Sequence, residues 1–367
     1  MIRPSIVGQI PPRRVPIYIK AGLLKQLDRC LFAPQRGCPL ELVTDRTVDS
    51  LYASRVVASL CRGKWHVHKT VLRNGEASKN ASTVHALHEG WFQRRRGRTT
   101  RVVALGGGAV TDTVGYAAAT FMRGVPLWLI PTTIIGQVDA AIGGKVGIND
   151  HRGKNLIGCF YHPTGIIVDP ETLVTLPLRE RRSGLAEVVK YGVIGDLELF
   201  ARCESELTSW LAGSSSLPLE VLRRCIRAKT EIVAADETDI GLRHILNFGH
   251  TLGHALEKWG RYRRFRHGEA IALGMVGAAC IASLRGMFSH RQMDRLAGLC
   301  GSLHGQTRAV EVTETELRTH LSFDKKRRLG RPVWVLPRAI GRVAVYDDIT
   351  AREIHEAIRF LRDWVKR

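Results

Sequence analysis

Closely paired cysteines are missing from this chain of 367 residues, although it contains eight cysteines. No two of them form a Cys-x-x-Cys pair, and positions 30, 38, 61, 159, 203, 225, 280 and 300 follow no regular spacing. Zinc ribbons need such pairs, and small disulfide-stapled domains need many cysteines in a short chain. The sequence indicates neither, and we expect most of these thiols to be small buried side chains.

Long hydrophobic runs and low-complexity tracts are also scarce. The longest apolar stretch, residues 270–284, is shorter than the roughly 20 residues that cross a bilayer, and its many alanines and glycines favour a packed core helix. The opening residues, Met1-Ile-Arg-Pro-Ser-Ile, contain no continuous apolar core of the kind found in secretory signals. We therefore expect a folded, cytoplasmic protein with no membrane partner.

Acidic residues are outnumbered, with 34 Asp and Glu against 55 Lys and Arg, which gives a net charge of +21. Local basic runs occur at residues 94–98, 261–266 and 325–328. Such charge attracts nucleic acid through its phosphates, or it steers an anionic small molecule toward a pocket. The basic runs are scattered and contain no nucleic-acid-binding motif, so we favour the small molecule and expect no nucleic-acid partner.

Apolar runs alternate with helical patterns through the first half of the chain. Residues 40–43, 65–71 and 101–105 are typical of strands, and residues 47–60 and 79–92 of amphipathic helices. This alternation predicts an α/β domain with a parallel-rich sheet covered by helices.

The strand at 101–105 runs directly into Gly106-Gly-Gly108, and we expect a helix from about Asp112 to Phe121. Glycines between a strand and a helix N-terminus let a phosphate approach the unpaired backbone amides. The same three glycines also fit a simple tight turn.

Two further strand ends carry polar side chains that suit a cofactor. Asp45 could hold the ribose hydroxyls of a dinucleotide or cap the next helix. Pro131-Thr-Thr133 follows the apolar run at 125–130, and its hydroxyls could contact a cofactor or cap a turn.

From about Leu176 onward the pattern is mostly helical, with little strand signal until residues 332–336. We therefore place a domain boundary near Pro177, which predicts an α/β domain at 1–176 and a mostly α-helical domain at 177–367. Ligands are expected in the cleft between the two parts.

His250 and His254 are four residues apart, and His267 follows in His-Gly-Glu. Residues at i and i+4 share a helix face, so two imidazoles can point into one cavity, as in a metal site. Histidines of an ordinary buried helix, satisfied by their neighbours, fit the same spacing. The helix-weakening Gly249, Gly253 and Gly268 favour the metal site, because they suggest close backbone approach.

Ordered motifs along nearly the whole chain resemble those of the 3-dehydroquinate synthase family. They are Gly75-Glu-x-x-Lys79, Gly106-Gly-Gly-x-x-x-Asp112, Pro131-Thr-Thr133, Gln137-Val-Asp139, Gly143-Gly-Lys145, Gly153-Lys-Asn155, Gly184-Leu-Ala-Glu-Val-Val-Lys190, Lys229, Ala235-Asp-Glu237, Arg243, Leu246-Asn-Phe-Gly-His-Thr251, His267-Gly-Glu269 and Asp324-Lys-Lys326.

This resemblance implies an N-terminal NAD-binding domain and a C-terminal metal-binding domain, with the active site between them. It implies that the metal, Zn²⁺ or Co²⁺, is bound by Glu187, His250 and His267. His254 then matches a position that handles substrate and protons, so it leaves the ligand set suggested by its spacing. One carboxylate and two imidazoles leave positions open for the hydroxyls of a sugar-like substrate.

The resemblance also implies the contacts of the two organic ligands. The residues implied for NAD are Asp45, Glu76, Lys79, Gly107, Gly108, Asp112, Thr132, Thr133 and Thr172. Those implied for the substrate are Asp139, Lys145, Lys154, Asn155, Lys190, Lys229, Arg243, Asn247, His254, Lys325 and Lys326. Lys145, Lys190, Lys229, Arg243, Asn247 and His254 are implied as catalytic. So many cations suit a substrate with both a carboxylate and a phosphate.

The activity implied is conversion of 3-deoxy-D-arabino-heptulosonate 7-phosphate to 3-dehydroquinate and phosphate by a homodimer of the shikimate pathway. NAD acts catalytically, so no net oxidation occurs. A related cyclase acting on another heptulose phosphate is the alternative. A metal-dependent alcohol dehydrogenase would instead accumulate NADH, and a nucleic-acid-binding protein would bind duplexes in a salt-sensitive manner without metal.

Three positions depart from the family pattern. Thr111 stands where glycine is usual, Ala141 lies in a pair that is usually richer in hydroxyls, and Val146 replaces threonine. Loss of small hydroxyls removes hydrogen bonds of about 0.5–1.5 kcal/mol each, so weaker NAD binding is one expected consequence.

Overall fold

The computed structural model describes residues 6–10, 13–31, 37–213, 216–305, 312–313, 316–317, 327–328 and 331–366. The chain divides into two compact units. The first contains residues 1–175 and 216–238, and the second contains residues 176–215 and 239–367. Each unit is described by itself.

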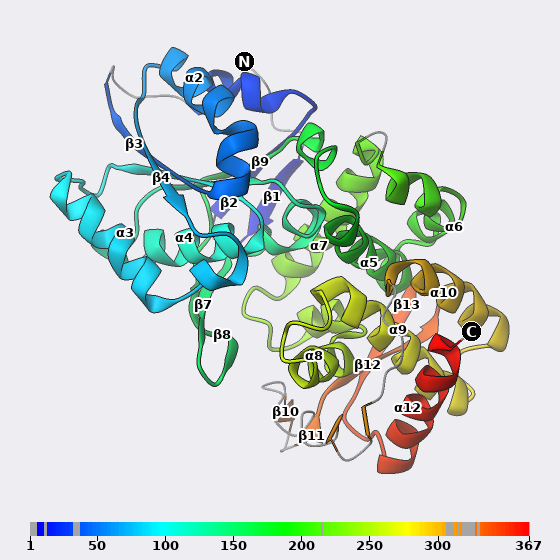
Figure 1. Ribbon diagram of the computed structural model, residues 1–367. Coiled ribbons are helices and arrows are strands. Elements are labelled where there is room, and N and C mark those ends of the chain that lie inside the picture. Colours follow the sequence, from blue (N-terminus) through cyan, green and yellow to red (C-terminus); the bar gives the residue numbers. More distant parts are fainter. Residues whose placement is uncertain are drawn as a thin grey trace. The chain divides into compact units, whose positions relative to one another are not determined.

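A seven-stranded sheet forms the centre of the first unit (Figure 1). Its strands are β1 (Ile6–Ile10), β2 (Arg13–Ile19), β3 (Pro39–Asp45), β4 (His66–Leu72), β5 (Arg101–Gly106), β6 (Leu127–Pro131) and β9 (Gly165–Val168). They are arranged in the order β1-β2-β9-β6-β5-β3-β4. Only β1 is antiparallel to its neighbour, and every other pairing in the sheet is parallel. The predicted parallel-rich α/β domain is therefore confirmed.

Strand register brings the carboxyl ends of the parallel strands to one edge of the sheet. Asp45 of β3 pairs with Leu72 of β4, and Gly106 of β5 pairs with Pro131 of β6. In open α/β sheets, ligands bind beyond this edge. The loops that leave these strands are thus the expected ligand-binding loops.

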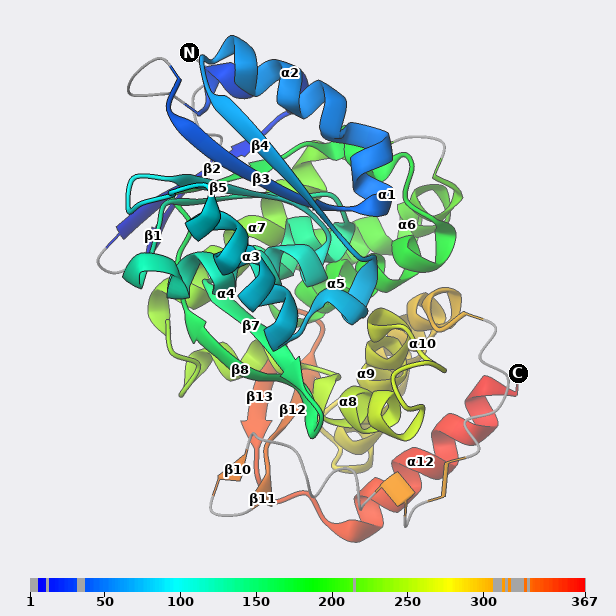
Figure 2. The same ribbon diagram turned by 60° about the vertical axis from the view of Figure 1, so that its left-hand side comes forward.

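Helices cover both faces of this sheet (Figure 2). The helical segments of the first unit are η1 (Leu23–Lys25), η2 (Leu27–Arg29), α1 (Arg46–Val48), η3 (Asp49–Ala53), α2 (Ser54–Arg62), η4 (Gly75–Ser78), α3 (Ala81–Gln93), α4 (Gly108–Thr120), η5 (Phe121–Arg123), η6 (Gly136–Ala140), η7 (Pro170–Leu173) and α7 (Leu219–Ala235). On one face, Val56 and Leu60 of α2 share a buried core with Leu40 and Leu42 of β3. Helices α3 and α4 pack together on the other face.

A separate hairpin of β7 (Lys145–Asp150) and β8 (Gly153–Phe160) projects from the first unit, with β7 packed along α4 (Figure 2). Gly147 and Gly158 face each other across it, and a Cβ on Gly158 would meet the Val146 carbonyl oxygen at 2.2 Å. Glycine at this position therefore allows the two backbones to pair closely.

The second unit is mainly helical. Its helices are α5 (Leu178–Gly195), α6 (Leu197–Ala212), η8 (Leu242–Asn247), α8 (His250–Trp259), α9 (His267–Leu284), α10 (His290–Leu303) and α12 (Ala351–Val365). Short antiparallel strand pairs join β10 (Arg327–Arg328) to β11 (Arg331–Pro332) and β12 (Trp334–Ala339) to β13 (Arg342–Tyr346). The predicted helical character of this region is confirmed.

Helix α9 lies at the centre of the second unit, where α5, α8, α10 and α12 all pack against it. Among the described residues it is the one helix with the length and composition of a membrane span, yet 83% of that stretch is buried. Buried core helices can have the same length and apolar composition, so these properties of α9 are weak evidence that it crosses a membrane. Its burial agrees with the packed core helix expected for residues 270–284.

Several predicted boundaries differ from the structure. Helix α4 begins at Gly108 rather than near Asp112, because the backbone turns into the helix as soon as it leaves the glycines. The helix expected at 47–60 contains the π-helical segment η3. We predicted one domain boundary after residue 176; the second unit begins at Leu176, but α7 groups with the first unit because it packs against β1 and η6.

Candidate active site

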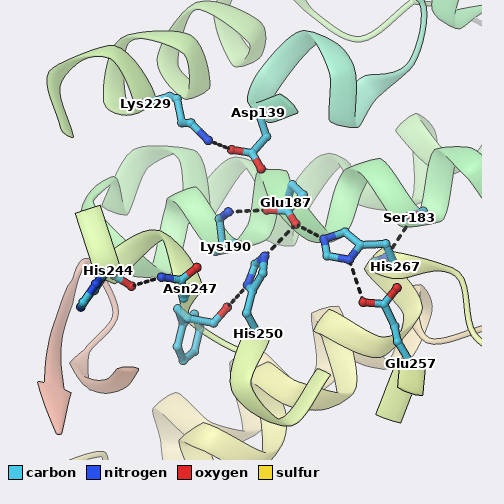
Figure 3. Close-up of polar contacts among 12 residues, drawn as sticks. Asp139, Ser183, Glu187, Lys190, Lys229, His244, Asn247, His250, Glu257 and His267 are labelled. Atoms are coloured by element: carbon cyan, nitrogen blue, oxygen red, sulfur yellow. Dashed lines mark hydrogen bonds and ion pairs between the residues drawn. The ribbon is translucent and has the colours of Figure 1, made fainter. Parts of the chain in front are cut away.

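Glu187, His250 and His267 converge in the second unit, each from a different helix (Figure 3). Nε2 of His267 lies 3.2 Å from Oε1 of Glu187, and Nε2 of His250 lies 3.6 Å from the same oxygen. Glu187 is completely buried on α5. These are the three metal ligands that the resemblance implies, and the fold brings them together.

The other nitrogen of each imidazole is held by an acceptor. Nδ1 of His250 lies 3.0 Å from the carbonyl oxygen of Phe248, and Nδ1 of His267 lies 3.1 Å from Oε2 of Glu257. With the proton on Nδ1, both Nε2 lone pairs face the Glu187 carboxylate, and such a group of acceptors requires a cation or a proton among them. The donor set and its orientation therefore fit a divalent metal ion.

Two opposing effects act on the pKa of each imidazole. Burial lowers it, because the charged ring is disfavoured away from water, and nearby carboxylates raise it. For His250, burial outweighs the Glu187 carboxylate and keeps the pKa well below its usual value of 6.5. For His267, the carboxylates of Glu257 and Glu187 outweigh burial and raise the pKa to about 10. A proton and a metal ion compete for the same Nε2 atom, so a bound metal displaces this proton.

Close packing of α9 against α8 and α5 explains two of the glycines in this region. Gly249 precedes α8 with φ of 78°, in the left-handed region, and a Cβ there would meet the Ile271 carbonyl oxygen at 2.9 Å. A Cβ on Gly268 would meet the Ser183 carbonyl oxygen of α5 at 2.0 Å. The predicted close backbone approach is present, and it lets the three ligand-bearing helices meet.

Polar residues of the implied substrate site lie near these ligands in the second unit. Lys190 is one turn from Glu187 on α5, is 1% exposed and forms an ion pair with Glu187 Oε2. Arg243 is buried in η8, and Asn247 donates from Nδ2 to the His244 carbonyl oxygen at 3.0 Å. The His254 ring centroid lies 6.0 Å from that of His267.

In the first unit, the residues implied for NAD follow the carboxyl ends of the parallel strands. Gly107 is the N-cap of α4, directly after β5, and Thr132 and Thr133 follow β6. The Thr132 amide donates to the Gly106 carbonyl oxygen at 3.0 Å, which joins these two loops. Together they place backbone amides and hydroxyls beside a helix N-terminus, an arrangement that suits a phosphate group.

Lys79 and Asp112 form a largely buried ion pair, with 2.5 Å between Nζ and Oδ2. Burial lowers the pKa of Lys79, but the carboxylates of Asp112 and Glu76 outweigh it and raise the pKa overall. Lys79 therefore stays charged at neutral pH. It supplies a fixed positive charge beside α4.

Two other residues implied for NAD have structural partners of their own. Asp45 caps α1 by accepting from the Val48 amide at 3.0 Å, which is the helix cap considered for it above. The Thr172 hydroxyl donates to the Asp169 carbonyl oxygen at 2.8 Å and accepts from Gln137 Nε2 at 3.0 Å. Neither contact tests a role in NAD binding, which stays a prediction.

The remaining substrate residues of the first unit lie on η6, α7 and the β7–β8 hairpin. Lys229 of α7 forms an ion pair with Asp139 of η6 (Figure 3). Lys145 begins β7, and Lys154 and Asn155 follow Gly153 at the start of β8. Lys325 and Lys326 lie outside the described residues.

The three departures from the family pattern are all buried. Thr111 donates from its hydroxyl to the Gly108 carbonyl oxygen at 3.2 Å. Val146 packs against Gly115, where a Cβ would lie 2.4 Å from a Val146 methyl, and Ala141 is 2% exposed. Their effect on NAD binding stays a prediction.

Sequence reasoning missed Glu257 and Asn149. Glu257 lies seven residues after His250 on α8, so helical periodicity alone could have placed it on the same face. Asn149 gave no comparable signal, because its side chain contacts Glu76, which is distant in sequence.

Comparisons with known proteins agree with this arrangement. Residues 69–183 match the model of the 3-dehydroquinate synthase N-terminal region, and residues 184–327 match that of the C-terminal region. The chain belongs to the 3-dehydroquinate synthase family. A 3-dehydroquinate synthase of Desulforamulus reducens is 40% identical over 343 residues, which cover 93% of this chain and 96% of that protein.

Two solved structures resemble this member of the 3-dehydroquinate synthase family closely. The 2-epi-5-epi-valiolone synthase of Streptomyces hygroscopicus subsp. jinggangensis 5008, with NAD⁺ and Zn²⁺ bound, has a TM-score of 0.86 at 31% identity, covering 95% of this chain and 97% of that one. A 2-deoxy-scyllo-inosose synthase complexed with carbaglucose-6-phosphate, NAD⁺ and Co²⁺ has a TM-score of 0.86 at 26% identity, covering 96% and 98%. The family and fold expected from the motifs are confirmed.

Proposed function

We propose that this protein is a 3-dehydroquinate synthase, a lyase that converts 3-deoxy-D-arabino-heptulosonate 7-phosphate to 3-dehydroquinate and phosphate in the shikimate pathway. Family membership supports the activity. The observation that carries the proposal is the cluster of Glu187, His250 and the half-buried His267, in which both Nε2 atoms face one carboxylate oxygen.

Glu187, His250 and His267 would hold Zn²⁺ or Co²⁺, the ions named in the two related structures. When bound, such an ion lowers the pKa of a substrate hydroxyl and polarises the carbonyl formed on its oxidation. Glu257 and the Phe248 carbonyl hold the imidazoles in the orientation this requires.

NAD⁺ would be bound at the carboxyl edge of the sheet in the first unit. The Gly107–Gly108 turn and the α4 N-terminus suit its pyrophosphate, and the Lys79 ammonium adds a positive charge. Asp45, Glu76, Asp112, Thr132, Thr133 and Thr172 complete the proposed set. NAD⁺ bound there would supply a hydride acceptor that is regenerated within one turnover, so no NADH would accumulate.

The substrate carries a carboxylate and a phosphate, which explains the number of cations proposed to bind it. Lys145, Lys154 and Lys229 would contribute from the first unit, and Lys190 and Arg243 from the second. Asp139, Asn155 and Asn247 add polar contacts, and Lys325 or Lys326 is the further proposed cation. Orientation by so many groups matters because one substrate passes through oxidation, elimination, ring opening and aldol closure.

In this proposal, His254 is the protein group that transfers protons. His254 is an exposed imidazole beside the metal cluster, with its ring centroid 5.3 Å from that of His250, and an imidazole can both donate and accept a proton. The departing phosphate of the substrate accepts the proton lost during elimination. The lysines and Arg243 then stabilise negative charge as it develops.

A related cyclase that acts on another sugar phosphate is the second candidate. The likeness to the valiolone and inosose synthases favours it, since both have TM-scores of 0.86. The curated 3-dehydroquinate synthase is more similar in sequence, at 40% identity against 31% and 26%, so we place it second.

We further propose a cytoplasmic homodimer without nucleic-acid or membrane partners. The family resemblance supports the dimer, and light scattering coupled to size-exclusion chromatography measures it directly. A monomer at micromolar concentration would contradict this part of the proposal and leave the reaction unaffected.

Phosphate release from the heptulosonate phosphate, measured with and without chelator and followed by product identification, tests the function. We expect NAD⁺-dependent release that stops with chelator and resumes on adding Zn²⁺ or Co²⁺, with 3-dehydroquinate as product. Release only from sedoheptulose 7-phosphate or glucose 6-phosphate would favour the second candidate. Net NADH formation without phosphate release would contradict both.

A further inference from the structure

The β7–β8 hairpin contains a bulge at the residues proposed to grip the substrate. Pairing is regular from Lys145↔Phe160 to Ile148↔Ile157, but the next pair is Asp150↔Gly153. Between these pairs, Asn149 alone on β7 faces Lys154, Asn155 and Leu156 on β8. Bulges of this kind occur beside active sites, where they change the direction in which side chains point.

Asn149 makes hydrogen bonds in two directions from this position. Its backbone amide donates to the Lys79 carbonyl oxygen at 2.9 Å, and its Nδ2 donates to Oε2 of Glu76 at 2.6 Å. Its Oδ1 accepts from the backbone amide of Asn155 at 2.9 Å. An asparagine side chain has both a donor and an acceptor, so one residue can hold both groups.

The bond to Asn155 acts on an unusual backbone conformation. Asn155 has φ of 54°, in the left-handed region that residues other than glycine rarely adopt. Conformations of this kind persist where surrounding contacts hold them, and they are common at ligand-binding sites. The Asn149 carboxamide supplies such a contact at the bulge that carries Lys154 and Asn155.

We propose that Asn149 is a positioning residue that couples the binding of NAD⁺ to the binding of substrate. This inference rests on the proposed function, in which Glu76 and Lys79 contact NAD⁺ and Lys154 and Asn155 contact the substrate. A nucleotide that fixes the 75–79 segment also fixes Asn149, and Asn149 then holds the bulge in its substrate-binding conformation. Coupling of this kind is reciprocal, so bound substrate strengthens nucleotide binding by the same factor.

Two variants of Asn149 separate its side-chain bond to Glu76 from its side-chain bond to Asn155. Asn149→Asp keeps an oxygen to accept from the Asn155 amide, but it places a second carboxylate against Glu76 and removes the donor. Asn149→Ala removes both side-chain contacts. Asp150→Asn is the matched control, because Asp150 bonds to Arg152 within the same turn at 2.5 Å.

The measurement is the dissociation constant of NAD⁺ for the metal-loaded protein, by calorimetry, with and without a phosphonate analogue of the heptulosonate phosphate that cannot release phosphate. In the wild type and in Asp150→Asn, we expect the analogue to tighten NAD⁺ binding by about fivefold or more. The ratio of NAD⁺ affinities with and without the analogue is the coupling ratio. In both Asn149 variants we expect the analogue to change NAD⁺ affinity by less than about twofold. Asn149→Asp keeps wild-type affinity for the analogue alone, whereas Asn149→Ala loses it.

Thermal melting of each variant shows whether it is folded. The coupling ratio compares two NAD⁺ affinities of the same folded protein, so a modest loss of stability does not change it. Asn149 variants that keep the wild-type ratio would overturn the inference. The inference would also be overturned if Asp150→Asn lowered the ratio as much as the Asn149 variants do. The same holds if the analogue left the NAD⁺ affinity of the wild type unchanged. Wild-type protein that binds no NAD⁺ at all would instead overturn the proposed function.

Discussion

The two units present their candidate ligand residues in different ways. In the first, many of these residues lie in loops that leave a parallel sheet or on the helices that follow them, and Gly107, Asp112 and Thr133 remain partly exposed. In the second, the candidate metal ligands come from the middle of α5 and the first residues of α8 and α9, and Glu187 is completely buried. Loops obtain their positions from strand register, whereas the candidate metal ligands obtain theirs from the packing of their helices and from the acceptors that hold the imidazoles.

This difference has consequences for substitution. A residue of the proposed NAD site shares its ligand with many neighbours, so its loss should weaken binding by degrees. A metal ligand shares its ion with two others, and removal of one leaves a buried, incomplete set. The second unit should therefore respond in an all-or-none manner, and the first in a graded one.

The largest effect is expected at His250. In His250→Ala, loss of one of three ligands should abolish stoichiometric metal binding and lower turnover by about a thousandfold or more, measured by elemental analysis and phosphate release. His290→Ala, which changes an exposed histidine at the start of α10, is the control and should keep both. Full activity in His250→Ala would remove the distinction between the two regions.

A smaller effect is expected at Glu257, which touches His267 and is absent from the proposed ligand set. Glu257→Gln removes the charge that holds Nδ1 of His267, so metal affinity should fall by roughly 10- to 100-fold. Competition with a fluorescent chelator measures this affinity. Glu206→Gln, which removes a carboxylate paired with Arg202 on α6, should leave it unchanged. An unaltered metal affinity in Glu257→Gln would mean that the helices alone orient His267.

In the first unit, Asp112→Asn tests the graded response. The variant removes a carboxylate proposed to contact NAD⁺, and loss of a hydrogen bond to a charged group costs about 1.5–3 kcal/mol, so NAD⁺ affinity should fall about 10- to 100-fold while metal content is unchanged. Calorimetric titration with NAD⁺ provides the measurement. Asp49→Asn breaks a more exposed pair with Lys69 and is the control. Complete loss of metal from Asp112→Asn would show that the two regions are not separable.

The smallest effect is expected at Glu353, far from either set of ligand residues in sequence. Arg285 holds the pKa of this carboxyl at about 2, below its ordinary value of 4.5, through a bond of 2.5 Å. The charged form is therefore stabilised by folding, so its contribution is present above pH 4.5 and is lost as the pH falls toward 2. After allowance for solvent screening, Glu353→Gln should lower the unfolding free energy by about 1 kcal/mol at neutral pH.

Urea denaturation at several pH values checks this last prediction. The difference between wild type and Glu353→Gln should shrink as the pH falls below 4.5. A difference that grows in acid would have the wrong sign for a depressed carboxyl pKa. Metal and NAD⁺ binding should remain at wild-type levels throughout the neutral range.

Elements with strong local patterns could be predicted from the sequence. Strands β3 and β5 and helix α3 agree with their predicted ranges to within about two residues, because each has a clear apolar period. Hairpin β7–β8 was not predicted, because its glycines and polar residues hide the alternation. The membership of α7 in the first unit depends on packing against distant β1, which no local pattern encodes.

The candidate site divides in the same way. Histidine spacing placed His250 on a helix face suited to a metal, but it also suggested His254, which lies outside the Glu187 group. Glu187 gave no signal of its own, since a lone glutamate within a helix is usually a surface residue. Only the family resemblance selected it, and the fold then brought it within reach of both histidines.

The path of the chain also has a consequence for synthesis. The polypeptide leaves the first unit after residue 175, returns at 216 and leaves again after 238, so α7 and its Lys229 arrive late. A fragment truncated at residue 176 would lack the helix that lies along β1. On the ribosome, the N-terminal sheet cannot acquire its full covering until roughly two thirds of the polypeptide has emerged. Attempts to produce either half alone should therefore use a circular permutant or an internal fusion, not a single cut.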